Sequence, residues 1–437
     1  MRRKTRSSEA DDHPSLKQLQ VGAVTLAERF NTVRARSAEL CAPLVTEDYV
    51  VQSMPDVSPA KWHLAHTSWF FETFILKPYR PGYEPFHPRY DYLFNSYYVQ
   101  VGARHCRPRR GLLSRPTVED IYRYRAHVDA HMREFLQELK EEEQAKLASL
   151  LELGLNHEQQ HQELIVTDIK HVFSCNPLRP AYQRRDAGET VAVPSIKWIA
   201  YEGGLQEIGH NQQSFAFDNE GPRHQVWLQP YRLASRPVTN GEYLEFLADG
   251  GYTRAELWLS DGWDQVVRQG WTAPLYWERH ANRWFTYTLA GMHEVDEAEP
   301  VCHISYYEAD AYACWAGARL PTEQELEVAA GPLAITGNFA ENGRLHPLPV
   351  KAASDSALSQ IYGDVWEWTC SPYVAYPGFR AAAGAIGEYN GKFMCNQLVL
   401  RGGSCATAQT HIRPSYRNFF YPDARWQFSG IRLAQDI

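Results

Sequence analysis

The first 175 residues carry the apolar repeat of helices. Apolar side chains recur every three or four positions in four segments, which cover residues 15–44, 59–77, 117–135 and 147–172. Four amphipathic helices of this length predict a four-helix bundle, a fold in which metal sites are built from side chains that point into the core.

Capping signals predict where these helices begin and end. Ser58 followed by Pro59 predicts an N-cap and a first helical turn, and Pro78 predicts the end of that second helix. Thr117 with Asp120 predicts the start of the third helix. The long loop between them, residues 78–116, is rich in Tyr and Arg, so we expect it to be functional.

Beyond about residue 176 the pattern changes to short alternating stretches with many Pro, Gly, Trp and Tyr residues. Only two helices are predicted there, over 239–247 and 305–316, which indicates a loop-rich α+β domain. The predicted organisation is a disordered tail (1–14), a helical bundle (15–175), a linker (176–198) and a second domain (199–437).

Length and composition narrow the class of protein. A chain of 437 residues is too long for one ordinary core, which favours at least two domains. A net charge of −8 argues against nucleic acid as a partner, and no apolar run predicts a membrane span or a signal peptide. Eight cysteines without a CxxC pair indicate reduced thiols, and hence a cytoplasmic protein. The sequence leaves room for a homo-oligomer.

Two histidines in the fourth helix provide the first chemical signal. His157 and His161 are four residues apart, so they lie one turn above the other on the apolar stripe of that helix. Burying both beside Gln160 and Glu163 is costly unless they share a partner. The pattern therefore predicts a metal site rather than two core histidines.

The same stretch has the H-E-x-x-H spacing of zinc metalloproteases, in which Glu158 would be the general base. That alternative lacks its usual third ligand, because Leu164, Thr167 and Asp168 stand where a glycine and a histidine are expected.

The inward face of the second helix offers a third ligand instead. His66 lies between Trp62 and Trp69, and His63 lies nearby on the same helix. The residues alone leave both histidines open as ligands. Three imidazoles on one face of an octahedral ion leave three positions free, and imidazole suits Zn, Fe and Cu alike.

Motifs along almost the whole chain resemble one family, the sulfoxide synthases of ergothioneine biosynthesis. The chain resembles their DinB-like bundle at the N-terminus and their formylglycine-generating-enzyme-like domain, a C-type-lectin-like fold, at the C-terminus. The N-terminal motifs are residues 62–66 (WHLAH), 94–98 (FNSYY) and 157–161 (HEQQH). The C-terminal motifs are residues 217–224 (FDNEGPRH), 237–243 (PVTNGEY), 317–323 (GARLPTE), 363–368 (GDVWEW) and 401–404 (RGGS).

The resemblance implies a non-haem Fe(II) enzyme with small-molecule substrates. It would use O2 to join the sulfur of a cysteine-type thiol to C2 of the imidazole of hercynine, giving a sulfoxide. By motif, the iron ligands would be His66, His157 and His161.

The resemblance also suggests which residues hold the substrates. Gln160 would hold the imidazole, Asn418 the carboxylate of hercynine, and Phe419 and Phe420 its trimethylammonium group. Tyr97 or Tyr98 would donate a proton or a hydrogen atom. By their chemistry, Arg107 and Arg110 are the candidates for the carboxylate of the thiol, because a guanidinium fork matches it. The tandem tyrosines favour cysteine over γ-glutamylcysteine as that thiol.

Two further alternatives remain beside the zinc hydrolase. A formylglycine-generating enzyme needs two cysteines for copper shortly after the Gly-Gly-Ser turn, but residues 401–418 contain only Cys405. A non-catalytic lectin-like binding protein is favoured only if the histidines are core residues.

Overall fold

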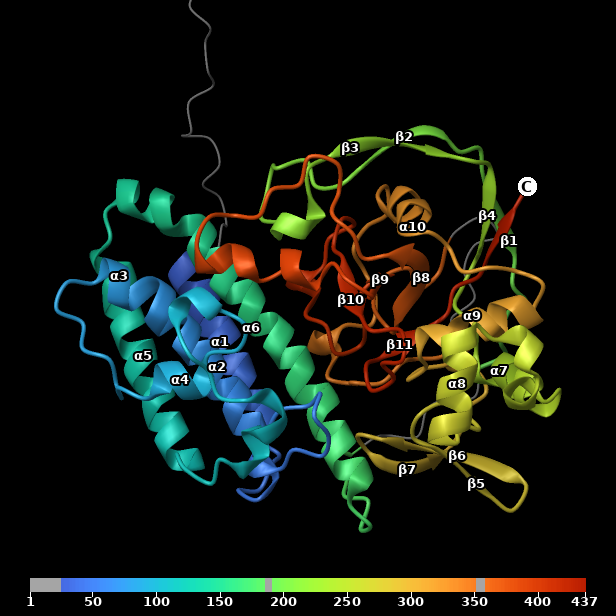
Figure 1. Cartoon of the computed structure of the whole chain (residues 1–437), viewed down its shortest axis with the longest axis horizontal. Coiled ribbons are helices and arrows are strands. Elements are labelled where there is room, and N and C mark those ends of the chain that lie inside the picture. Colours follow the sequence, from blue (N-terminus) through green and yellow to red (C-terminus); the bar gives the residue numbers. More distant parts are fainter. Residues whose placement is uncertain (1–24, 185–190, 351–357) are drawn as a thin grey trace, which may run out of the picture.

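The computed structural model describes residues 25–184, 191–350 and 358–437. A helical part and a strand-containing part lie side by side, and helix α6 runs along the border between them (Figure 1). Within these ranges no helix combines the length and the apolar character needed to cross a membrane.

The helical part is the predicted four-helix bundle. Helix α6 packs against α1 and α2, and α2 also packs against α5. The four helices are α1 (Leu26–Cys41), α2 (Ala60–Phe71), α5 (Val118–Glu138) and α6 (Glu141–Cys175). The loop between α2 and α5 contains short α4 (Tyr90–Phe94) and two 3-10 turns (Val99–Val101 and Arg107–Leu112).

Two predicted helix starts can be compared with the structure. The capping box of α5 is confirmed, because the Asp120 amide donates to Thr117 Oγ1 at 3.1 Å and the Thr117 amide donates to Asp120 Oδ2 at 3.0 Å. Helix α1 has a capping box between Thr25 and Glu28 and ends at Cys41, three residues earlier than predicted. The predicted start of that helix at residue 15 lies outside the described residues.

The predicted cap of the second helix is wrong, and the helical run extends one residue past Pro78. Helix α2 begins at Ala60 without a side-chain cap, and Ser58 Oγ instead accepts a hydrogen bond from Arg110 at 2.9 Å. Pro78 does not end the helix, because a π-helical turn (Glu72–Leu76) leads into α3 (Lys77–Tyr79). Pro78 lacks an amide hydrogen, and α3 ends one residue later, at Tyr79.

The second part is an α+β domain, as predicted, and its described residues form four small sheets. The last strand, β12, pairs with β4 and so ties the C-terminus to the start of the domain. The first sheet has the strand order β1 (Trp198–Tyr201), β4 (Tyr231–Ala234) and β12 (Ala434–Asp436). The second has the order β10 (Asn418–Phe420), β9 (Leu398–Arg401), β8 (Trp366–Pro372) and β11 (Ser429–Gly430). The third pairs β2 (Gly204–Ile208) with β3 (His224–Leu228), and the fourth has the order β5 (Trp277–His280), β6 (Arg283–Thr288) and β7 (Gly291–Glu294).

The two predicted helices of this domain are present, as α7 (Asn240–Ala248) and α9 (Tyr306–Trp315). Two others were missed, α8 (Ser260–Gln269) and α10 (Glu323–Ala330). Helix α10 is only eight residues long, although Thr322 and Glu325 form a capping box at its start that the sequence displays.

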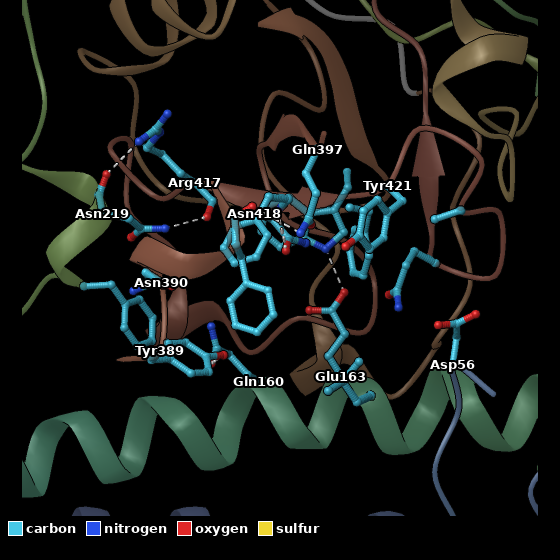
Figure 2. Close-up of a pocket in the computed structure, with 18 of the residues that line it drawn as sticks. Asp56, Gln160, Glu163, Asn219, Tyr389, Asn390, Gln397, Arg417, Asn418 and Tyr421 are labelled. Carbon is cyan, nitrogen blue, oxygen red and sulfur yellow. Dashed lines mark hydrogen bonds between the residues drawn. The ribbon is translucent and has the colours of Figure 1, made fainter. Parts of the chain in front are cut away.

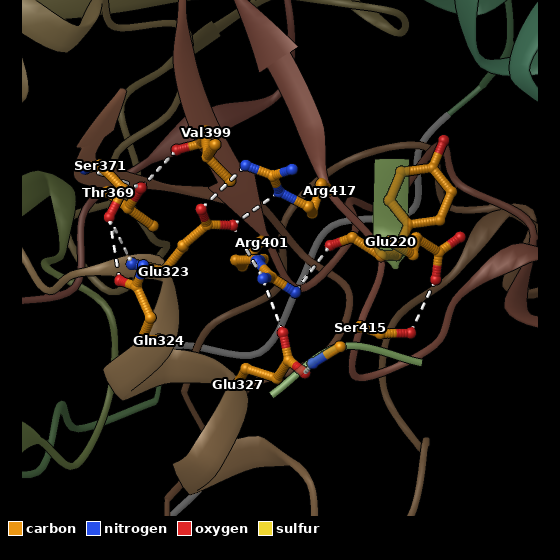
Figure 3. Close-up of polar contacts among 12 residues, drawn as sticks. Glu220, Glu323, Gln324, Glu327, Thr369, Ser371, Val399, Arg401, Ser415 and Arg417 are labelled. Atoms are coloured by element: carbon orange, nitrogen blue, oxygen red, sulfur yellow. Dashed lines mark hydrogen bonds and ion pairs between the residues drawn. The ribbon is translucent and has the colours of Figure 1, made fainter. Parts of the chain in front are cut away.

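Helix α10 anchors the strand that leads into the predicted hercynine site. Glu323 accepts hydrogen bonds from Arg401 of β9 at 2.9 Å and from Arg417 at 2.8 Å, and Glu327 accepts from Arg401 at 2.7 Å (Figure 3). All four side chains are buried, so the ion pairs are shielded from water and fix the geometry firmly. Asn418 follows Arg417 directly and is therefore held in place.

Candidate metal centre and substrate cleft

Helices α2 and α6 bring three imidazoles together inside the bundle. One ligand atom from each of His66, His157 and His161 lies within 4.8 Å of the others, and all three residues are buried. His66 Nε2 and His157 Nε2 are 3.2 Å apart. Three neutral nitrogen donors at such distances match the ligand set of a divalent transition metal.

The hydrogen bonds of the Nδ1 atoms determine which nitrogen of each imidazole faces the metal site. His66 Nδ1 donates to the carbonyl oxygen of Phe94 at 2.6 Å, and His161 Nδ1 lies 2.8 Å from His63 Nδ1. His157 Nδ1 is buried and has no hydrogen-bond partner in the part of the chain that the structure describes. The Nε2 atoms of His66 and His161 are thus left for a metal, and His157 Nε2 points toward them.

A stack of planar groups holds the His66 ring. Trp62 lies parallel to one face at a centroid distance of 4.6 Å, and Trp69 lies parallel to the other at 5.4 Å. The guanidinium of Arg110 covers the far side of Trp62, 3.3 Å from a ring centroid. Packing on both faces fixes the plane of the imidazole before any metal binds.

Burial keeps these imidazoles in the form that binds metals. Removal from water lowers the pKa of His157 to about 3 and lowers the pKa values of His66 and His161 well below their usual range. All three are therefore neutral near pH 7, and a neutral imidazole has a lone pair for a metal.

The zinc-protease interpretation is wrong, because Glu158 points away from the histidines. Its carboxylate accepts hydrogen bonds from Arg34 at 2.9 Å, Arg125 at 2.6 Å and Ser37 at 2.6 Å. Burial alone would raise the pKa of Glu158, but Arg125 and Arg34 lower it to about 2. Glu158 therefore joins helices within the bundle and cannot activate a water molecule at the metal site.

A cleft of about 210 Å³ separates α6 from the strand-containing domain. Figure 2 shows Gln160 and Glu163 rising from α6, with Asn418 on the opposite wall. The cleft is lined by six of the residues predicted to contact substrates or to take part in catalysis: Tyr97, Arg107, Gln160, Asn418, Phe419 and Phe420. The structure thus brings together residues from both halves of the chain.

Gln160 meets two tyrosines that the sequence did not reveal. Its Nε2 donates to the hydroxyl of Tyr416 at 2.8 Å, and its Oε1 accepts from the hydroxyl of Tyr389 at 2.5 Å. Tyr416 also lies 2.9 Å from His411 Nε2. These contacts hold the Gln160 amide, and a substrate imidazole has to replace one of them to bind it directly.

The opposite wall is built on strand β10. Asn418 Oδ1 accepts a hydrogen bond from the Phe419 amide at 2.9 Å, so the amide nitrogen of its side chain remains a donor for a ligand. Phe419 stacks on Tyr373 at a centroid distance of 4.0 Å and lies near Phe393 at 6.0 Å. Aromatic faces grouped in this way attract a quaternary ammonium group.

The two tandem tyrosines occupy different places. Tyr97 is half-buried and lines the substrate cleft, whereas Tyr98 is buried against Trp69 and lines a second cavity of about 450 Å³ that His157 also borders. Burial raises the pKa of Tyr98, so its hydroxyl stays protonated. Glu388 of the other domain fixes the following turn by accepting from the amides of residues 99 and 100, each at 2.9 Å.

Only one of the two predicted arginines lines the cleft. Arg107 does so, but Arg110 is buried and donates to Ser58 Oγ at 2.9 Å and to Ser96 Oγ at 3.1 Å. Its remaining contact is the stack on Trp62. The structure therefore does not bring Arg110 to the cleft beside Arg107.

Glu163 joins the two domains, a role that the sequence did not indicate. Its buried carboxylate accepts hydrogen bonds from Trp366 Nε1, Ser404 Oγ and Thr407 Oγ1, each at 2.7 Å. Trp366 and Ser404 belong to two of the C-terminal motifs, which thus dock directly on α6 beside Gln160 and His161. Glu163 and Trp366 also line the substrate cleft.

Comparison with known proteins agrees with this architecture. The DinB superfamily matches residues 29–165, and the sulfatase-modifying factor enzyme 1-like domain matches residues 185–437. A hercynine oxygenase of Mycolicibacterium smegmatis is 33% identical, over 94% of this chain and 99% of that protein. Another, of Mycobacterium tuberculosis, is 34% identical over 94% and 96%. Ergothioneine biosynthesis protein 1 of Schizosaccharomyces pombe is 31% identical over 51% of this chain and 28% of that protein.

The fold and the three-histidine site define a class, oxidoreductases that join a DinB-type metal-binding bundle to a formylglycine-generating-enzyme-like domain. Within that class, the chain belongs to the hercynine oxygenase family. Near-complete coverage of these relatives excludes the lectin-like binding protein and the formylglycine-generating enzyme as descriptions of the whole chain.

Proposed function

We propose that the protein joins the sulfur of cysteine to C2 of the hercynine imidazole with O2, in ergothioneine biosynthesis. The C2–H and S–H bonds break, and a C–S bond and an S–O bond form. One oxygen atom enters the sulfoxide, and the other leaves as water with the two hydrogens. The observation that carries this proposal is the position of Gln160 on α6, between two residues of the three-histidine site, His157 and His161. Gln160 also lines a cleft that has donors for carboxylates and aromatic faces for a cation.

We propose Fe(II) as the metal, held by His66, His157 and His161. Iron bound there would supply the one-electron chemistry that triplet O2 requires, and three histidines leave positions for both substrates and O2. Gathering the thiol and the imidazole at one site makes their coupling effectively intramolecular, which lowers the entropic barrier.

The chain's own residues would orient the two substrates. Gln160 holds the imidazole of hercynine, and Asn418 donates to its carboxylate. Phe419 and Phe420 accept the trimethylammonium group against their ring faces. Arg107 binds the carboxylate of the thiol. Arg110 would join it only by leaving Ser58 and Ser96, so we assign it chiefly to holding Trp62 against His66.

Oxygen uptake tests the proposed function. Purified protein loaded with Fe(II) should consume O2 only when hercynine and a thiol are both present, and mass spectrometry should find the sulfoxide of the coupled product. One O2 should disappear per sulfoxide formed. Coupling that proceeds at full rate without O2, or with zinc in place of iron, would exclude the proposal.

A first prediction concerns Tyr97 and Tyr98. Phenylalanine at both positions should lower the ratio of sulfoxide to thiol sulfinic acid, because the thiol still binds while a donor needed for productive coupling is gone. We expect a change of roughly 100-fold or more, the lower end of the usual range for general acid–base groups. Product analysis by mass spectrometry measures the ratio.

The two single variants separate the roles. Tyr97→Phe changes the residue that lines the substrate cleft, and Tyr98→Phe changes the one beside His157. Tyr122→Phe is a matched control, since it removes a half-buried hydroxyl from the same bundle whose partner is Tyr49. An unchanged product ratio in the double variant would reduce both tyrosines to packing residues.

A second prediction concerns the thiol. Among the described residues that line the cleft, positive charge comes from Arg107 and Arg417, and Glu323 neutralises Arg417. Arg107 donates to the main-chain carbonyl of Asp56 but has no ion-pair partner among the described residues. The cleft thus offers one cation for a thiol carboxylate, which suits cysteine better than γ-glutamylcysteine with its second carboxylate. At saturating hercynine, kcat/KM should be at least about tenfold higher for cysteine, equivalent to about 1.4 kcal/mol.

The opposite preference would overturn the choice of thiol and leave the iron site intact. Arg107→Met should raise the KM for the thiol and leave the KM for hercynine unchanged.

Finally, all eight cysteines are free, which supports our proposal of a reducing, cytoplasmic location.

A further inference from the structure

His63 contacts a metal-site histidine and a carboxylate at once. Its Nδ1 lies 2.8 Å from His161 Nδ1, and its Nε2 lies 3.0 Å from Asp168 Oδ2. All three side chains are buried. We infer that His63 and Asp168 form a relay that sets the tautomer of His161 and strengthens its bond to the metal. This inference rests on the proposed metal site.

The geometry of two helices creates the relay. His161 and Asp168 are seven residues apart on α6, which is two helical turns, so their side chains leave the same face. His63 reaches across from α2 and fits between them. The neighbouring His66, three residues later on α2, lies within the three-histidine group. Adjacent turns of one helix thus place one histidine in the site and one behind it.

The positions of the protons follow from the groups at the two ends of the relay, a metal at His161 and the carboxylate of Asp168. A metal at His161 Nε2 requires that nitrogen to be bare, so the proton of a neutral His161 is on Nδ1. His161 Nδ1–H then donates to His63 Nδ1. The proton of His63 is therefore on Nε2, from which it donates to Asp168 Oδ2. In this arrangement each imidazole donates one hydrogen bond toward the carboxylate.

Asp168 is held for this role. Its Oδ2 also accepts a hydrogen bond from the Ser58 amide at 2.8 Å, which fixes the carboxylate at the start of α2. Among the residues that the structure describes, His66 donates to a peptide carbonyl, whereas His161 is connected through His63 to a carboxylate. A carboxylate behind a ligating histidine raises the basicity of the ligand. His161 is therefore the strongest donor of the three.

Selective NMR of histidine nitrogens tests the tautomers directly. Protein labelled with ¹⁵N in histidine and loaded with Zn(II) as a diamagnetic probe should show His161 protonated at Nδ1 and His63 protonated at Nε2. The metal-free protein should show the same two tautomers, because Asp168 orders them without a metal. A wild-type His161 protonated at Nε2 would overturn the relay.

Metal affinity tests how much the relay contributes to metal binding. Asp168→Asn and His63→Phe should each raise the Kd for Zn(II) and Fe(II) by about 10- to 100-fold, the usual effect of losing such a partner. His63→Asn keeps an acceptor for His161 Nδ1–H and loses the link to Asp168, so its Kd should fall between those of wild type and His63→Phe.

Glu152→Gln is the matched control, because it removes a carboxylate from the same helix that pairs with Arg29 of α1 instead of a histidine. Its Kd should equal that of wild type. Asp168→Asn with a normal Kd and lower thermal stability would make the pair a packing contact and end the proposal. If wild type bound metal with the predicted tautomers but coupled no substrates, the proposed function would fail and the relay would stand.

Discussion

Replacing any one of the proposed iron ligands, His66, His157 or His161, by alanine should remove most of the bound metal and abolish turnover. Each side chain offers one nitrogen to a shared, buried centre, so a single loss leaves two ligands and an open coordination position. The loss of affinity should exceed the roughly 100-fold typical of residues that only support a ligand. Metal analysis per chain, combined with oxygen uptake, measures both effects.

Two controls bracket this result. His303→Ala removes another buried histidine, whose Nε2 lies 2.7 Å from Nζ of Lys170 near the C-terminal end of α6. This variant should keep the iron. His63→Ala should weaken the iron site without destroying it. Full iron and full rate in His66→Ala, together with loss of both in His63→Ala, would show that the ligand on α2 had been misassigned.

Glu158→Gln should destabilise the bundle by about 3–5 kcal/mol, the usual effect of breaking a buried ion pair on one side. The fully buried carboxylate neutralises Arg34 and Arg125, and glutamine leaves both guanidinium groups without that charge. Denaturant unfolding of the metal-free protein measures the change and excludes effects of lost metal.

Glu152→Gln provides the matched comparison on the same helix. Glu152 pairs with Arg29 at 2.6 Å, and both side chains are partly exposed, so the variant should change stability by less than about 1 kcal/mol. If Glu158→Gln unfolded like wild type and lost only activity, Glu158 would belong to the catalytic machinery after all.

The pair His157 and His161 shows what helical periodicity can predict and what it cannot. The spacing of His157 and His161 and the apolar stripe around them were enough to predict an inward pair, since a helix of known register fixes which side chains share a face. Glu158 follows His157 directly in the sequence, and periodicity alone did not show which groups its side chain contacts. One position in a helix turns a side chain by about 100°, and only the packed bundle shows that this direction leads to Arg34 and Arg125.

Helix ends show a different limit. The capping box of Thr117 and Asp120 is local and was predicted, whereas Ser58 looked like a cap and instead binds Arg110. Ser58 and Arg110 are far apart in sequence, so no local pattern reports their contact. Tertiary partners of this kind compete with local ones and can win when both groups are buried.

The sequence by itself determined the four helices, the change of character after residue 176 and, through its motifs, the family. Those features depend on local periodicity and on short stretches that a single chain displays. Only the tertiary structure decided how Gln160 meets Tyr389 and Tyr416, how Glu163 joins the domains and how His63 stands between His161 and Asp168. These are contacts between residues about 100 to 250 positions apart, and their partners are selected by the packing of whole elements rather than by neighbours in the chain.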